Sequence, residues 1–227
     1  DNTGISDFSA LSGLPVFHYL NAAGNQISDM DSVLELTRLT ELRLDDNDIA
    51  VIPDLSCYDQ LRVLSVANNE IINIDGMAGA PDSLIGIYLN DNKITSLDGL
   101  SGLDKTVLLY IQNNAVSDIS ELANLTEMVY LNASYNKIAD ISIAANFNAL
   151  KELYLNNNQI ADISALGGMN SAEKIAIQYN YIDISNGSAA KGVIDSLIGS
   201  GVSVTYKPQL YDVIDNRDRY FINALIR

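Results

Sequence analysis

The sequence predicts an α/β solenoid, a curved right-handed superhelix with a parallel β-sheet on its concave face and short 3-10 or irregular segments on its convex face. Three regularities lead to this prediction. An asparagine recurs at intervals of 22 residues, with one interval of 23; an aliphatic residue stands five positions before each asparagine, and another stands two positions after it. The recurring asparagines are Asn25, Asn47, Asn69, Asn92, Asn114, Asn136, Asn158 and Asn180. Eight matches in one frame exclude coincidence and indicate a tandem array of similar coils.

Each repeat contains one short strand followed by a polar turn. Apolar residues stand five and three positions before the asparagine, as at Leu42 and Leu44, so they point inward while the residues between them face solvent. The asparagine follows the strand, where its amide can bond to backbone groups that no neighbouring strand satisfies. We therefore expect the asparagines to be structural. An aspartate four residues later is expected to cap a short helical turn on the convex side, at Asp29, Asp118, Asp140 and Asp162.

The repeats divide the chain into four segments. Residues 17–184 hold eight repeats, and residues 1–16 fit the second half of a preceding repeat. Residues 185–207 are predicted to form a C-terminal cap of one helix and one strand, because a stacked array exposes apolar surface at its last coil. Residues 208–227 show helix-like apolar spacing, and this helical tail either packs on the cap or begins a following module. The extra residue of the 23-residue interval is expected to bulge near Gly79 and Pro81 without disturbing the strands.

Composition excludes several classes of function. The 227 residues include 13 basic and 29 acidic side chains, and the net charge of −16 argues against nucleic-acid binding and against direct binding to anionic membranes. The sequence contains no run of about 18 apolar residues, so it predicts no transmembrane helix. The single cysteine, Cys57, cannot form an internal disulfide. With nucleic acids and anionic membranes disfavoured, proteins and glycans are the partners that we expect.

The outward strand positions predict a candidate binding surface. The four coils between residues 63 and 134 contribute 12 such positions, and none of them holds an ionisable acid or base. Tyrosine offers a large apolar face and a hydroxyl at low conformational cost, which makes it a frequent interface anchor. We therefore predict that a ligand binds the concave face at Tyr88, Leu108, Tyr110, Tyr130 and Tyr154. Three of these tyrosines share one column, which Asn132 interrupts. The competing interpretation is that tyrosine simply suits a strand.

No catalytic, metal or cofactor site is predicted. The one histidine, His18, flanks the first strand, and a lone histidine is most often a surface residue. Cys57 falls in a convex return segment, where a packed thiol is expected. Asp45, Asp46 and Asp48 lack the spacing and the central glycine of a calcium loop, so we interpret them as solvated acids. The sequence therefore predicts a non-enzymatic protein without cofactors.

The repeat unit is that of a leucine-rich repeat, and it resembles one family in particular. The segments NQISDM, NAVSDISELANLTEM and NNQIADISALGGM resemble the 22-residue repeats of the internalin family of bacterial surface proteins, and the likeness extends from residue 3 to about residue 184. The resemblance implies an extracellular protein, secreted or attached to the cell surface, that binds a host or other cell-surface protein along its concave face. Tyr88, Tyr110, Tyr130 and Tyr154 would then be the aromatic contacts. The tail sequence DRYFINALIR is similar to the helix that opens N-terminal caps in related arrays, which implies a second array after this one.

The function expected from the sequence is therefore that of a protein-binding module of a bacterial surface or secreted protein. Three alternatives stay open. The tyrosines could stack on sugar rings in a glycan-binding adhesin, or the array could be an architectural spacer between other modules. It could also be an intracellular scaffold, because repeats of the same length occur in eukaryotic proteins that bind and regulate phosphatases.

Overall fold

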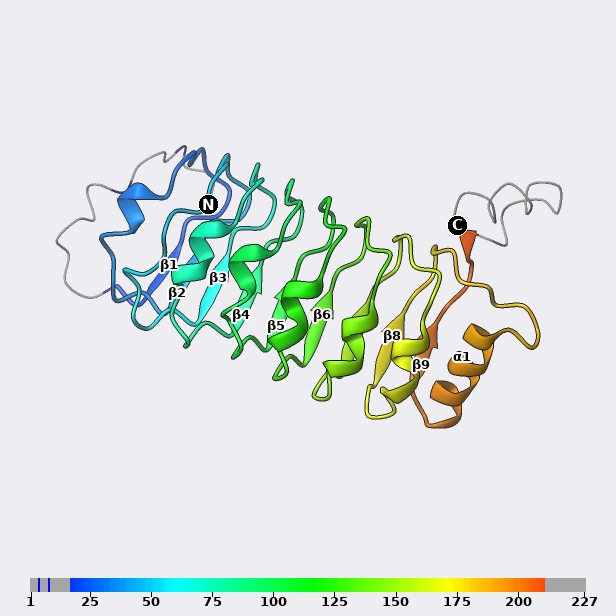
Figure 1. Ribbon diagram of the computed structural model, residues 1–227. Helices are drawn as coiled ribbons and strands as arrows, with labels where there is room; N and C mark the ends of the chain where they lie inside the picture. The colour runs from blue at the N-terminus through cyan, green and yellow to red at the C-terminus, as the bar shows by residue number, and fades with distance from the viewer. Residues whose placement is uncertain (1–3, 5–7, 9–16, 211–227) are drawn as a thin grey trace.

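Nine short parallel strands form one sheet that runs the length of the molecule (Figure 1). The computed structural model describes residues 4, 8 and 17–210. The strands are β1 (Tyr19–Asn21), β2 (Glu41–Arg43), β3 (Val63–Ser65), β4 (Gly86–Tyr88), β5 (Leu108–Tyr110), β6 (Tyr130–Asn132), β7 (Glu152–Tyr154), β8 (Lys174–Ala176) and β9 (Ser203–Thr205). Each strand pairs with the next in chain order, so the sheet has no crossover. The predicted fold class, a curved solenoid with a parallel sheet, is confirmed.

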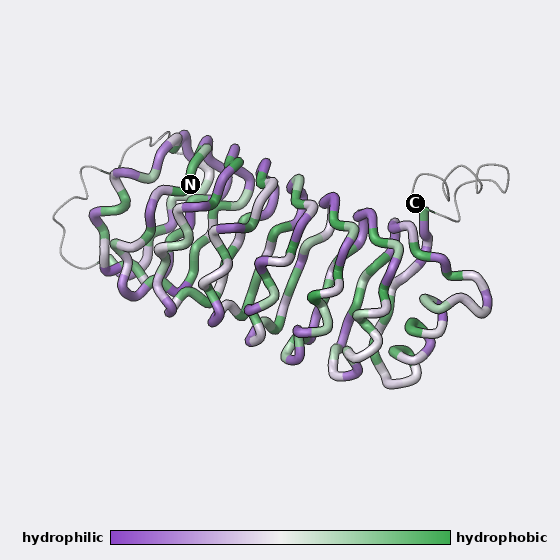
Figure 2. The backbone as a smooth tube through the Cα atoms, in the orientation of Figure 1, coloured by the Kyte–Doolittle hydropathy of each residue, from purple (hydrophilic) through white to green (hydrophobic). Residues whose placement is uncertain are grey.

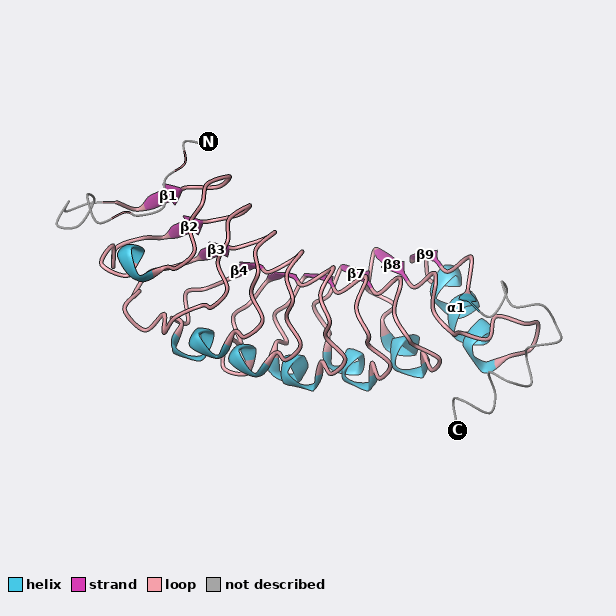
Figure 3. Ribbon diagram, turned by 90° about the horizontal axis from the view of Figure 1, so that it is seen from above, coloured by secondary structure: helices cyan, strands magenta, loops and turns pink. Residues whose placement is uncertain are grey.

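The side opposite the sheet consists of short helices and turns (Figure 3). In the described part of the chain the 3-10 helices span Asp31–Val33, Asp75–Gly79, Asp98–Leu100, Ser120–Asn124, Ser142–Asn146 and Ser164–Gly168. The carboxylates of Asp118, Asp140 and Asp162 each accept a hydrogen bond from the backbone amide two residues further on, at 2.8, 2.7 and 2.8 Å. Asp29 makes the same bond at 3.2 Å. The expected capping of the convex turns by aspartate is confirmed.

The hydrophobic core is a continuous column between the sheet and the convex helices. In β2 to β8 the central residue of the strand, such as Leu42, Leu64 or Ile87, is buried, and apolar residues from the convex turns pack against it. Figure 2 shows apolar and polar stretches alternating within each coil. A coil buries its apolar side only against its two neighbours, so the stability of the array depends on stacking.

The 23-residue interval leaves the sheet undisturbed, as expected. Val63 pairs with Gly86 and Leu64 with Ile87, in the register that all the other strand pairs share. The return segment after β3 contains the 3-10 helix Asp75–Gly79. Consecutive coils approach closely on this side, because a Cβ atom added to Gly99 would lie only 2.0 Å from the carbonyl oxygen of Ile74. Glycine is therefore required where the two turns meet.

A helix and a strand follow the last repeat. Helix α1 (Ala189–Gly199) begins after Ser188, whose hydroxyl accepts a hydrogen bond from the amide of Lys191 at 3.1 Å. Strand β9 then pairs with β8. The predicted remnant at residues 1–16, apart from residues 4 and 8, lies outside the described residues, as does the predicted helical tail from residue 211 onward. Among the described helices, none combines the length and the apolar character needed to cross a membrane.

Candidate functional site

The recurring asparagines tie the exit of each strand to the coil before it. The side-chain amide of Asn136 donates to the carbonyl of Ile111 at 2.9 Å and to two carbonyls of its own turn at 3.2 Å. Its side-chain oxygen accepts from the amide of Val116 at 3.0 Å. Ile111 and Val116 belong to the preceding coil, so one side chain bridges two coils. The same inter-coil bonds recur at Asn47, Asn69, Asn92, Asn114, Asn158 and Asn180. In the first coil Asn25 donates to two carbonyls of its own turn.

The residue immediately before each asparagine has left-handed backbone geometry. The φ angle lies between +51° and +58° at seven of these positions and is +69° at the eighth. The seven residues are Asp46, Asn68, Asp91, Asn113, Tyr135, Asn157 and Tyr179, and the eighth is Gly24. Sequence reasoning missed this column. The signal was available, because asparagine, aspartate and glycine tolerate this geometry best and dominate the position.

Four tyrosine rings form a continuous stack on the concave face. The ring centroids of Tyr88 and Tyr110 are 4.6 Å apart, and those of Tyr110 and Tyr130 are also 4.6 Å apart. The rings of Tyr130 and Tyr154 lie 5.4 Å apart with a 38° tilt. Tyr110 pairs with Asn132 in the sheet register, and Asn132 pairs with Tyr154, so the column itself is interrupted as expected. Tyr130 fills the interruption from the neighbouring column, because its ring lies between the rings of Tyr110 and Tyr154.

A cation covers each end of this tyrosine stack. The guanidinium carbon of Arg43 is 5.8 Å from the ring centroid of Tyr88, and the ammonium nitrogen of Lys174 is 4.9 Å from that of Tyr154. Both distances are within the range of cation–π attraction. The outer ring faces are therefore covered by cations and the inner faces by neighbouring rings. What the stack presents to a ligand is a row of ring edges and hydroxyl groups.

Each of the two cations has a carboxylate beside it. Arg43 forms an ion pair with Glu41 in the same strand. At the other end, the hydroxyl of Tyr154 donates to the carboxylate of Glu152 at 2.5 Å. The interaction with the Tyr154 hydroxyl raises the pKa of the Lys174 ammonium. The charges at the two ends of the stack are thus locally balanced, and the surface between them is uncharged.

The hydroxyl groups of the two middle rings stay protonated well above neutral pH. Burial, followed by the neighbouring Tyr110 and Tyr154, raises the pKa of Tyr130 far above its usual range. Burial and the adjacent Tyr88 raise the pKa of Tyr110. These groups therefore act as neutral hydrogen-bond donors and acceptors rather than as anions.

Leu108 lies beside the tyrosine stack rather than within it. It is half-buried in β5, where it pairs with Gly86 on one side and Tyr130 on the other. A Cβ atom on Gly86 would lie 3.7 Å from Cε2 of Tyr88 and 3.5 Å from a methyl carbon of Val63. A methyl group at Gly86 would therefore make ordinary contacts with these two side chains. Val63 and Leu108 extend the apolar surface next to the ring edges.

The other residues singled out from the sequence do not assemble into a reactive centre. His18 Nδ1 lies 3.1 Å from the carbonyl oxygen of Arg38. Cys57 packs against the core, and burial raises the pKa of its thiol. Asp45, interpreted as a solvated acid, instead accepts hydrogen bonds from the hydroxyl of Ser65 and the amide of Ala67, at 2.5 and 2.9 Å. Within residues 4, 8 and 17–210, no three metal-ligating side chains gather at one place.

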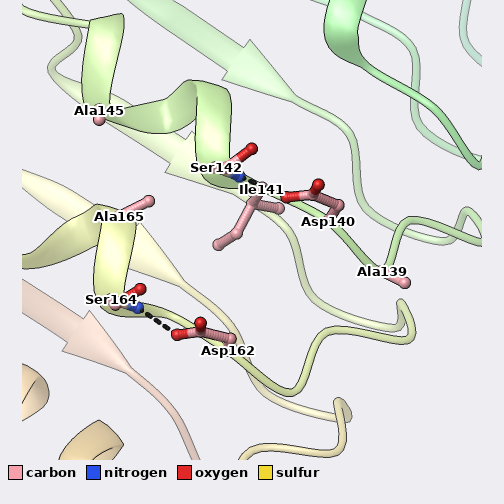
Figure 4. A pocket seen from close by; sticks show the side chains of 8 residues that line it. All are labelled: Ala139, Asp140, Ile141, Ser142, Ala145, Asp162, Ser164 and Ala165. Carbon is pink, nitrogen blue, oxygen red and sulfur yellow. Dashed lines mark hydrogen bonds between the residues drawn. The ribbon is translucent and has the colours of Figure 1, made fainter. Parts of the chain in front are cut away.

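A hollow on the convex side lies between the 3-10 helices Ser142–Asn146 and Ser164–Gly168 (Figure 4). Its lining consists of Ala139, Asp140, Ile141, Ser142, Ala145, Asp162, Ser164 and Ala165. Both carboxylates are engaged in capping, with bonds to the amides of Ser142 and Ser164. The remaining lining is small and mostly apolar, so the tyrosine stack is the better candidate for a functional site.

Comparison with known proteins identifies the repeats. A family model of leucine-rich repeats, in two copies, matches residues 126–168. An internalin of Listeria monocytogenes, InlF, is 29% identical with a TM-score of 0.81, over 90% of this chain and 58% of that chain. Internalin C2 of the same species is 28% identical with a TM-score of 0.75, over 83% of this chain and 80% of that chain.

A shorter match connects the chain to a eukaryotic protein. An Arabidopsis thaliana protein described as a protein phosphatase 1 regulatory inhibitor subunit homologue is 31% identical over 74 residues. The match covers 33% of this chain and 23% of the phosphatase subunit, so the chain spans only a small part of that relative. Arrays of this kind present an extended concave surface, and the fold suggests a protein-binding module. On the combined evidence of repeat, sheet and structural likeness, the chain is an internalin-like leucine-rich repeat protein.

Proposed function

We propose that the chain is a non-enzymatic module that binds a protein ligand on the tyrosine stack of its concave face. The observation that carries this proposal is the continuous stack from Tyr88 to Tyr154 on a surface without charged side chains between its two ends. The rings are held by one another and by the sheet, so they lose little conformational entropy when a ligand binds. A few such aromatic anchors can supply most of the affinity of an interface.

The ring geometry favours a protein over a glycan as the ligand. A sugar ring binds an aromatic side chain by lying flat on its face. Each face of Tyr110 and Tyr130 is already covered by a neighbouring ring at 4.6 to 5.4 Å, and the outer faces of the stack lie under Arg43 and Lys174. Ring edges and neutral hydroxyls suit the carbonyl groups and apolar side chains of a polypeptide better.

The location that we propose is the surface or the outside of a bacterial cell. The support is the likeness to two internalins of Listeria monocytogenes, at 28 and 29% identity. The ligand would then be a host protein or another cell-surface protein. The net charge of −16 argues against nucleic acid and anionic lipid as partners.

We also propose a boundary for the module. The eight repeats at residues 17–184 end in a cap at residues 185–207, built from α1 and β9. Gln209 extends this cap, because its side chain donates to the carbonyl of Ile177 at 3.0 Å and accepts from the amide of Asn180 at 3.0 Å. The bond to Ile177 takes the place of one that the next asparagine of the series would make, because Asn158 and Asn180 donate to the equivalent carbonyls of Ala133 and Leu155. A structural role for the asparagines and for Gln209 follows from the same bonds.

The test is the binding of fluorescently labelled protein to intact mammalian epithelial cells, with bacterial cell wall as the second surface. The double variant Tyr110→Ala, Tyr154→Ala is expected to bind the cells at least about tenfold more weakly at an unchanged thermal midpoint. The matched control is Tyr19→Ala, which removes a tyrosine of the same face outside the stack and should leave binding unchanged. Equal binding by native protein and double variant would contradict the proposal and favour the spacer.

Enzymatic treatment of the cells separates the two ligand classes. Mild proteolysis should abolish binding if the ligand is a protein, whereas removal of surface glycans should leave it intact. The opposite pattern, or competition by free sugars, would identify a glycan-binding adhesin instead.

A second candidate function is that of an intracellular scaffold for a phosphatase. The observation in its favour is the 31% identity over 74 residues to the Arabidopsis phosphatase 1 regulatory subunit homologue. Titration calorimetry with the purified catalytic subunit of protein phosphatase 1 distinguishes the two candidates. Micromolar or tighter binding would support the scaffold function, and the absence of any heat of binding would exclude it.

A further inference from the structure

Two tyrosines occupy the left-handed position that precedes the asparagine. Tyr135 has a φ angle of +56° and Tyr179 one of +58°. In the other six coils this position holds Gly24, Asp46, Asn68, Asp91, Asn113 and Asn157. Those are the residue types that tolerate left-handed geometry, whereas a bulky side chain there is strained. On grounds of backbone strain alone, asparagine, aspartate or glycine would be more stable than tyrosine at both positions.

Burial of the side chains does not offset the free-energy cost of this strain. The residue Tyr135 is 55% exposed and Tyr179 is 40% exposed, which places both among the most exposed large apolar residues of the described chain. A residue that is strained in its backbone and gains little from packing is a sign of function, because the fold offers nothing else that would retain it. Tyrosine is also one of the residue types that are enriched among interface hot spots.

These two tyrosines lie on the part of the rim that carries no acidic side chain. The rim consists, in each coil, of the asparagine, the two residues before it and the one after it. In the coils of β5 to β8 these 16 positions contain three tyrosines, one basic residue, Lys137, and no carboxylate. In the coils of β2 to β4 the corresponding 12 positions contain five carboxylates, at Asp45, Asp46, Asp48, Glu70 and Asp91. The rim is thus strongly acidic at one end and nearly neutral at the other.

The neutral part of the rim continues the tyrosine stack. Tyr135 follows β6, which contributes Tyr130 to the stack, and Tyr179 follows β8, which pairs with the β7 strand of Tyr154. Tyr130, Tyr154 and the two rim tyrosines therefore belong to the three adjacent coils of β6 to β8. A ligand that rests on Tyr130 and Tyr154 reaches Tyr135 and Tyr179 by crossing from the concave face to the rim.

We propose that Tyr135 and Tyr179 form the second half of the ligand site, and that the protein ligand extends from the tyrosine stack over this rim with an uncharged, hydrogen-bonding segment. The proposal rests on the proposed function of the stack. The chemistry of the segment follows from charge, because the rim of these coils offers one cation and no anion to pair with. A basic segment would find its complement only at the acidic end, beside Asp46 and Asp91.

The decisive variant is Tyr135→Asn, Tyr179→Asn, which installs at both positions the residue that the array itself uses at Asn68, Asn113 and Asn157. Because asparagine relieves the strain, the thermal midpoint should stay the same or rise. Binding to intact epithelial cells, measured by flow cytometry, should weaken by at least about tenfold. A loss of binding in a protein that has become more stable cannot arise from misfolding.

The matched control is Asp46→Asn, Asp91→Asn, which makes the same kind of exchange in the same column at the acidic end. This control should bind the cells like the native protein. If the rim variant also binds like the native protein while Tyr110→Ala, Tyr154→Ala has lost binding, the proposed function stands and the rim proposal is overturned. If the native protein does not bind the cells, or if both tyrosine variants bind fully, the proposed function fails together with this inference.

Discussion

At the scale of single residues, the asparagines explain why the array has a fixed register. Asn47 and the six later asparagines each join two coils through the side chain, and an aspartate of the same shape would present an anion to the same carbonyl groups. Asn158 is buried, and its amide donates to the carbonyl of Ala133 at 2.9 Å and to that of Leu155 at 3.0 Å. Its oxygen accepts from Ile138 at 3.0 Å. No other residue type supplies both functions at this length.

Replacement of Asn158 by alanine should therefore destabilise the protein. Several buried backbone groups would lose their partners, at about 1 kcal/mol or more for each, so the free energy of unfolding should fall by about 2 to 4 kcal/mol. Urea denaturation followed by circular dichroism measures this change. Gln159→Ala, the exposed neighbouring residue, is the control and should change stability by less than about 0.5 kcal/mol. A similar loss in both variants would show that the bonds of Asn158 are not the cause.

Tyrosine titration is a second test at this scale. The pKa values of Tyr110 and Tyr130 are raised because burial disfavours the charged form. In the unfolded chain both would ionise near pH 10. The stability linked to these groups is therefore complete below about pH 10 and is lost as the pH rises above that value. Burial also raises the pKa of Tyr58. Ultraviolet absorbance of tyrosinate should therefore show at least three groups that titrate late, and Tyr130→Phe should remove one of them and reduce the alkaline loss of stability. Normal titration of all the tyrosines would contradict the stacked geometry.

At the scale of elements, the short convex turns set how closely the coils stack. The 3-10 helix Asp98–Leu100 contains Gly99, which is buried against the carbonyl group of Ile74 in the preceding coil. The neighbouring turn uses Gly76 in the same way, since a Cβ there would lie 2.3 Å from the carbonyl oxygen of Ile52. At the entrance of these turns the side-chain oxygens of Ser96 and Asn73 accept hydrogen bonds from the amides of Asp98 and Asp75, at 3.2 and 2.6 Å. The convex side is thus shaped by backbone contacts rather than by side-chain packing alone.

The variant Gly99→Ala should strain this contact and lower the free energy of unfolding by about 1 to 3 kcal/mol, as overpacked sites do. Gly102→Ala is the matched control in the same coil, because a Cβ at that position meets nothing within 4 Å. The control should be neutral or slightly stabilising, since alanine restricts the unfolded chain. Thermal denaturation of the two variants side by side tests the prediction. Equal midpoints would mean that the turns can separate without cost.

At the scale of the whole molecule, the array behaves as a one-dimensional stack that needs its ends closed. Gln209 is fully buried and bonds to Ile177 and Asn180, so the chain beyond β9 still belongs to the stack. In a stacked array the loss of an end contact weakens the nearest coils most. The tyrosine stack reaches β7, only two strands from this end.

Replacement of Gln209 by alanine should therefore loosen the C-terminal coils selectively. Amide hydrogen exchange is expected to accelerate in β8, β9 and α1, while β2 to β4 keep the protection of the native protein. Gln209→Asn should behave like the alanine variant, because the shorter side chain does not reach both partners. A uniform increase of exchange along the array would contradict local closure by Gln209.

The fold and the composition of the concave face were predictable from the sequence. A period of 22 residues repeats one local pattern, and because each coil touches only its neighbours, that pattern determines the strands, their order and the residues that share a column. Tyr88, Tyr110 and Tyr154 could be placed in one column for this reason. Only the tertiary structure decided that the ring of Tyr130 lies between those of Tyr110 and Tyr154, and that Tyr135 and Tyr179 have left-handed backbone angles. It also decided that Gln209 donates to the carbonyl of Ile177, which the next asparagine of the series would otherwise bond. The physical reason is that register along a stack follows from spacing, whereas ring directions, backbone angles and end contacts depend on what surrounds each side chain in space.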